Sequence, residues 1–70
     1  MFPTPKLPWK FKVLACRVHE IRGFVVLTER VDDTIVYCRY ISHRMDNEGN
    51  CTLGHYVDDI HKAWDDFYTR

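Results

Sequence analysis

The chain has 70 residues, enough for one small domain, and 46% of them are hydrophobic, which is too many for a disordered chain. Ten basic and ten acidic residues give a formal net charge of zero, which weighs against nucleic acid as the main partner. Residues 1–44 hold eight Lys or Arg against four acids, whereas residues 45–70 hold two against six. This division favours either steering of a charged partner to one part of the molecule or attraction between the two parts within the fold.

All three prolines lie near the start of the chain, at Pro3, Pro5 and Pro8. Proline fixes φ and has no backbone N–H donor, so residues 1–9 are predicted to form an extended arm. Its large apolar side chains are expected to pack against a single domain formed by residues 10–70.

Three runs rich in β-branched and aromatic residues follow the arm: "KFKVLACRVHE" at 10–20, "GFVVLTERV" at 23–31 and "TIVYCRYIS" at 34–42. Each run predicts a strand. Gly23 and the segment "VDDT" supply turn residues between them. After "DNEGN", which has strong turn composition, "CTLGHYV" at 51–57 predicts a fourth and weaker strand, because Gly54 interrupts it.

The last segment has the period of a helix. Its apolar residues recur at i, i+3, i+4 and i+7, which predicts an amphipathic helix over 58–69 with Asp58 as the N-cap: Ile60, Ala63, Trp64 and Phe67. The two aromatic side chains are expected to cover one face of the sheet. The predicted fold is therefore α+β and β-rich, either a four-stranded antiparallel meander or a partly open SH3-like barrel, with an extended N-terminal arm and a C-terminal helix.

The segment "CRYISHRMDNEGNCTLGHY" contains four residue types that bind zinc: Cys38, His43, Cys51 and His55. A loop over 46–49 would place Cys38 on the same face as Cys51 and His55, and a loop over 46–50 would place His43 there instead. Neither register brings all four side chains together. We therefore expect no metal and no other cofactor, and we interpret Cys38 as a small buried hydrophobic residue.

No motif of an enzyme is present: the chain lacks G-x-G-x-x-G, a P-loop, H-E-x-x-H and an EF-hand loop. The pairs Asp58-Asp59 and Asp65-Asp66 are expected on the solvated side of the helix. Three cysteines without a C-x-x-C pair indicate a reducing compartment, and no apolar stretch is long enough to span a bilayer. We therefore expect a non-enzymatic, cytoplasmic protein without a membrane partner.

Tyr, Trp and Arg are the residue types enriched at interface hot spots, so the preferred hypothesis is a protein-binding module. The candidate contact residues are Trp9, Arg17, Tyr37, Arg39, Tyr40 and Tyr56, with Asp58, Asp65 and Asp66 as a second, acidic surface. The alternative is binding of single-stranded nucleic acid by a basic and aromatic face of the sheet. Open strand edges are also compatible with a homodimer.

The segment "GFVVLTERVDDTIVYCRYIS", followed by a turn, a short strand and "VDDIHKAW", resembles the very small SH3-like or Tudor-type meanders of short bacterial and phage proteins. The resemblance covers roughly residues 11 to 64 and consists of the order of elements. It implies a binding module, and phage- or mobile-element-encoded examples often modulate a host protein. It carries over no functional residue.

Overall fold

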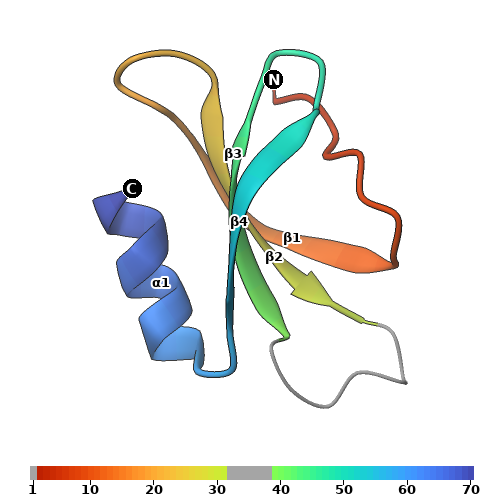
Figure 1. Ribbon diagram of the computed structural model, residues 1–70, viewed down its shortest axis with the longest axis vertical. Helices are drawn as coiled ribbons and strands as arrows, with labels where there is room; N and C mark the ends of the chain where they lie inside the picture. Colours follow the sequence, from red (N-terminus) through yellow and green to blue (C-terminus); the bar gives the residue numbers. More distant parts are fainter. Residues whose placement is uncertain (1, 32–38) are drawn as a thin grey trace.

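A computed structural model describes residues 2–31 and 39–70 and shows an antiparallel sheet with a helix on one face (Figure 1). The elements, in chain order, are β1 (Phe11–Val18), β2 (Phe24–Arg30), β3 (Tyr40–Met45), β4 (Cys51–Val57) and α1 (Ile60–Thr69). Each strand pairs with its neighbour in sequence, in the order β1-β2-β3-β4. The sheet is therefore an open meander with β1 and β4 at its edges, and the predicted β-rich α+β class is confirmed.

The third strand differs from its prediction over 34–42. It begins at Tyr40 and continues to Met45, because β2 pairs with it as far as Phe24 opposite Met45 and Val25 opposite Arg44. The sequence did not predict that the strand continues through residues 43–45, because residues 42–44 are polar and strands are recognised from apolar residues. Residues 34–38 of the predicted strand lie outside the described residues.

The core lies between α1 and the sheet. Val25, Leu27, Ala63 and Phe67 are buried together there, and further apolar residues pack against them: Leu14, Ala15, Tyr40, Val57 and Trp64. The rings of Trp64 and Phe67 meet edge to face, with their centroids 5.7 Å apart. The prediction that these two aromatic residues cover one face of the sheet is confirmed. The ten residues of α1 are too few to cross a bilayer, and no helix of the described chain is both long and apolar enough to do so.

The helix begins at Ile60, and its N-cap lies one residue later than predicted. Its N-cap is Asp59, whose backbone is extended and whose carboxylate accepts a hydrogen bond from the His61 amide at 2.8 Å. The prediction of Asp58 as the N-cap is wrong, because the capping carboxylate must reach the amide two residues further along and Asp59 does so. Asp58 instead lies in the exposed connection from β4.

The N-terminal arm covers part of the sheet face opposite α1 (Figure 1). The Lys6 amide donates to the Gly49 carbonyl at 2.9 Å, and the rings of Phe2 and Phe24 meet edge to face at 5.4 Å. Gly49 has a φ of 91°, and a Cβ there would lie 2.2 Å from the Thr4 carbonyl oxygen. The close approach of arm and loop therefore requires glycine at this position.

The hairpin between β3 and β4 has the longer of the two loops considered above. Met45 pairs with Cys51, so the loop is 46–50. A bulge in β4 then changes the register, and Ser42 pairs with His55. As a result His43 shares a face with Cys51 but not with His55, which points to α1. For this loop the sequence argument predicted that His43 would share a face with both Cys51 and His55, because it assumed regular pairing of β3 with β4 without a bulge.

Candidate binding site

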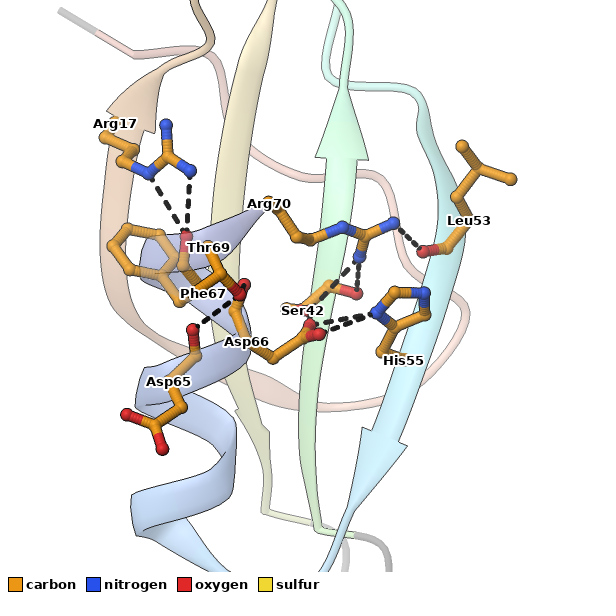
Figure 2. Close-up of polar contacts among 9 residues, drawn as sticks. All are labelled: Arg17, Ser42, Leu53, His55, Asp65, Asp66, Phe67, Thr69 and Arg70. Atoms are coloured by element: carbon orange, nitrogen blue, oxygen red, sulfur yellow. Dashed lines mark hydrogen bonds and ion pairs between the residues drawn. The ribbon is translucent and has the colours of Figure 1, made fainter.

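A cluster of polar side chains joins the C-terminal half of α1 to β3 and β4 (Figure 2). The Asp66 carboxylate accepts a hydrogen bond from Ser42 Oγ and lies 2.9 Å from His55 Nδ1. Arg70 donates from Nη1 to the Ser42 carbonyl at 2.7 Å and to Ser42 Oγ at 3.1 Å, and from Nη2 to the Leu53 carbonyl. The helix is thus tied by hydrogen bonds to the backbone of both neighbouring strands.

The charge of Asp66 is stabilised within this cluster. Burial acts to raise the pKa of the Asp66 carboxyl group, but the hydrogen bonds from Ser42 and His55 and the charges of His55 and Arg70 outweigh it. The pKa is therefore held below its usual value. The carboxylate remains an acceptor for both strands at neutral pH.

Ser42, His55 and Asp66 are the residue types of a catalytic triad, but their order in space is different. A serine nucleophile needs a histidine to take its proton and an acid behind that histidine. Here the acid lies between the other two, because Ser42 donates directly to Asp66, and Ser42 is buried with 2% of its surface exposed. The arrangement is that of a structural link and not of an activated nucleophile.

The described residues contain no group of three or more His, Cys, Asp or Glu side chains placed to hold a metal ion. Of the four residues in the zinc-like segment, Cys38 lies outside the described part of the chain. His43 and His55 point to opposite faces of the sheet. Burial raises the pKa of the Cys51 thiol, which keeps it protonated at neutral pH.

A groove of about 590 Å³ lies at one end of the sheet, between the turn that joins β1 to β2 and the 46–50 loop. Its lining residues come from both hairpins: Arg22, Gly23, Arg44, Met45, Asp46, Asn47, Glu48, Asn50, Thr52 and Leu53. Gly23 has a φ of 73°, and a Cβ there would lie 2.5 Å from the Met45 carbonyl oxygen. Glycine at this position therefore lets the turn lie directly against the end of β3.

The loop wall of the groove is held by Asp46. Its carboxylate accepts hydrogen bonds from the Glu48 amide at 2.8 Å, the Asn50 amide at 2.9 Å and the Asn50 side chain at 3.0 Å. These bonds, the Asn50 side chain first among them, lower the pKa of Asp46. Asp46 therefore fixes the conformation of the loop through hydrogen bonds to the loop itself.

Arginines from both hairpins line the groove. Arg44 comes from β3, and its Nη2 donates to the Arg22 carbonyl at 3.3 Å. Its Nε is buried and has no hydrogen-bond partner among the described residues. Arg22 is exposed on the turn. The groove thus presents two guanidinium groups from different hairpins.

Exposed aliphatic side chains flank these arginines. Leu53 is 68% exposed and, with a φ of 53°, is the one described residue other than glycine in the left-handed region. Ile21, which precedes Arg22 in the turn, is 82% exposed. Strained backbone of this kind often occurs at functional sites.

Several residues predicted to contact a partner also make contacts within the chain. The Arg30 guanidinium lies over the Trp9 ring at 4.6 Å. Arg17 donates two hydrogen bonds to the Phe67 carbonyl, at 3.1 and 2.9 Å (Figure 2). Tyr40 packs against the core, and Asp66 belongs to the cluster described above.

Tyr37 lies outside the described residues, and the other predicted contact residues are exposed but dispersed. Arg39 lies 3.9 Å from the Glu29 carboxylate, near the far end of the sheet from the groove. Tyr56 is 50% exposed and, following His55, points to the face opposite α1. Asp58 lies before α1 and Asp65 on it. Of the residues that the structure describes, these four do not converge on one site.

Comparison of the chain with protein-family models, with curated protein sequences and with solved structures found no match. No family is therefore assigned to it. The sequence did not indicate the groove, because Arg22 and Arg44 are distant in the chain and the pairing of β2 with β3 and the close approach of Gly23 to Met45 bring them together. The one local signal was a glycine beside an arginine in a predicted turn.

Proposed function

We propose that the chain is a non-catalytic protein-binding module and that its contact site is the groove at the end of the sheet. The observation that carries the proposal is the exposed Leu53, held in a left-handed conformation at the rim of a groove of about 590 Å³. A groove of this size matches the range of pockets that take small ligands or one or two side chains of a peptide.

The chemistry of the groove also supports a protein partner. Interfaces combine apolar contacts with a limited number of hydrogen bonds, and arginine is enriched among the residues that contribute most to binding. Leu53 in the lining and Ile21 beside it in the β1–β2 turn supply exposed apolar surface, and Arg22 and Arg44 supply donors. A partner segment would bury the two aliphatic side chains and form hydrogen bonds with the two arginines.

The resemblance to SH3-like and Tudor-type meanders adds a finer proposal. Small domains of that kind typically bind other proteins, and those encoded by phages or mobile elements often modulate a protein of their host. The open meander of β1 to β4 has the order of elements on which the resemblance rests. A modulator of a host protein is therefore the form of binding module that we propose.

Single-stranded nucleic-acid binding has less support. That function needs exposed aromatic rings beside cations. The Trp9 ring is covered on one side by Arg30, and Tyr40 packs against the core under α1. Lys10 before β1 and Lys12 on it are exposed, but the Phe11 ring between them is half-buried.

Site-specific photo-crosslinking tests the proposal. Benzoylphenylalanine is placed at Leu53 in the groove or, as the control, at Lys62 on the exposed side of α1, and each protein is irradiated in lysate of its native cells. We expect a discrete protein adduct from position 53 that position 62 does not give. Equal adducts from both positions would contradict the groove as the contact site. Strong, salt-dependent binding of labelled single-stranded DNA or RNA by the purified protein would favour the alternative.

A further inference from the structure

We propose that the groove binds a carboxylate of an acidic peptide segment through Arg22 and Arg44. This inference rests on the proposed function and names the chemical class of the ligand. A peptide carboxylate presents two oxygen acceptors in one plane, which matches the paired donors of a guanidinium group.

Arg44 supplies the strongest evidence. Its Nε is buried without a partner in the described chain, and the hydrogen bond from its Nη2 to the Arg22 carbonyl is long, at 3.3 Å. A buried charged donor without an acceptor costs free energy, and such groups are rare in folded proteins. The buried Nε is out of reach of a ligand, but the Nη groups of Arg44, which lines the groove, keep donors for an oxygen acceptor there.

Arg22 supplies a second donor group from the other hairpin. It is exposed, and its side chain makes no hydrogen bond or ion pair with any residue that the structure describes. Arg70 adds further positive charge nearby: burial first, and then the charge of Arg44, act to lower the pKa of Arg70, against the charge of Asp66. An acceptor between the two hairpins would therefore meet guanidinium groups with unused donors.

The acids in the groove limit how much negative charge a ligand can carry. Asp46 uses both carboxylate oxygens within the loop, whereas the exposed Glu48 lies in the lining and carries a negative charge. Two arginines opposed by two acids suit a single carboxylate better than a phosphate dianion or a row of phosphates. This balance favours a peptide over a nucleic acid.

The neighbouring apolar side chains specify the residues beside the carboxylate. Leu53 and Ile21 are largely exposed, and Leu53 belongs to the groove lining. Contact with aliphatic side chains of a partner would remove this surface from water. The expected ligand is a peptide with Asp or Glu next to Leu, Ile or Val.

Selection from a random dodecapeptide phage library tests this inference on the full chain. We expect the recovered peptides to contain an acidic residue beside an aliphatic one. Replacing that acid in a synthetic peptide by its amide should weaken binding about tenfold or more, as measured by fluorescence anisotropy. Arg22→Met and Arg44→Met should each weaken binding of the acidic peptide but have little effect on the amide peptide, whereas Lys62→Met on α1 should leave both unchanged.

The possible outcomes separate the inference from the proposed function. Peptides that bind in a Leu53-dependent manner but are insensitive to the amide change would overturn the carboxylate and leave the groove as a protein-binding site. Displacement of the peptide by a single-stranded oligonucleotide would also overturn the inference. Failure to recover any peptide that depends on Leu53 would overturn both. Because Arg22 is exposed, Arg22→Met should fold normally, so the test does not depend on the stability of Arg44→Met.

Discussion

Arg70, which caps α1, donates a hydrogen bond to the main-chain carbonyl of Leu53 in β4 (Figure 2). Leu53 has a φ of 53°, a conformation that costs a residue with a side chain on the order of 1–3 kcal/mol. The same guanidinium bonds to the Ser42 carbonyl and hydroxyl. The end of the helix therefore holds the backbone at the rim of the groove.

Removal of this guanidinium should destabilise the protein. We expect Arg70→Met to lower the free energy of unfolding by about 1–3 kcal/mol, because three main-chain and side-chain acceptors lose their donor. Adding Leu53→Gly should restore part of the loss, since glycine adopts positive φ without strain. Urea unfolding measures both changes, with Lys62→Met as the control. An unchanged stability for Arg70→Met would show that the contact with Leu53 contributes nothing.

His43 should make the protein less stable in mild acid. Burial, and then the charge of Arg70, lower the pKa of His43 to about 4, and its ring packs closely over Gly54. The folded state keeps His43 neutral, whereas the unfolded chain protonates it below about pH 6.5. The free energy of unfolding should therefore fall as the pH drops from about 6.5 to 4, with a slope from this group approaching ~1.4 kcal/mol per pH unit.

Urea unfolding at a series of pH values measures that slope. His43→Gln should reduce it, because the group that binds the extra proton on unfolding is removed. His61→Gln, at an exposed position of α1, is the matched control and should leave the slope unchanged. Equal slopes for the native chain and His43→Gln would mean that His43 is not the titrating group.

Asp66 should contribute stability at neutral pH that is lost in acid. Its pKa is lowered in the folded state, so its contribution is present above the pKa of the unfolded chain, about 3.9, and is lost as the pH falls through the folded value. We expect Asp66→Asn to cost about 1–3 kcal/mol at pH 7, because Ser42 and His55 lose a charged acceptor. Thermal unfolding of this variant and of the exposed neighbour Asp65→Asn gives the comparison. A similar loss for both would argue against a specific role of Asp66.

Substitution of Gly49 should release the N-terminal arm. Gly49→Ala places a Cβ against the Thr4 carbonyl and forces alanine into positive φ, so the hydrogen bond from the Lys6 amide should be lost. We expect faster tryptic cleavage after Lys6 and faster alkylation of Cys16, which lies in the pocket under the arm. Mass spectrometry follows both reactions. Asn47→Ala in the same loop is the control, and equal rates in the two variants would show that the arm does not depend on Gly49.

Local sequence patterns were sufficient for much of the fold. The β-branched runs identified the strands, and the spacing of Ala63, Trp64 and Phe67 identified the helix and the face that it buries. These features follow from the period of side chains along a single element. They therefore need no knowledge of the rest of the chain.

The candidate site depended on contacts that no local pattern encodes. Arg17 was predicted to contact a partner because arginine is enriched at interface hot spots. Its bonds to the Phe67 carbonyl, fifty positions along the chain, leave no sign in the sequence. The bulge that turns His55 to α1 and exposes Leu53 is likewise invisible in "CTLGHYV". Gly54 indicated that the strand is interrupted, but not that its neighbour Leu53 would adopt a positive φ.

The meander has a consequence for how the molecule assembles. Because β1, β2, β3 and β4 pair in sequence order, every strand pairing closes a short stretch of chain at low entropic cost. Contacts between residues close in the sequence need the shortest loop closures, so we expect the hairpins to form first. Docking of α1 onto β2 bridges a far longer separation and would come last. Arg70's contact with Leu53 in β4 spans only 17 positions, so the binding rim would take shape when α1 meets β4, before that final step.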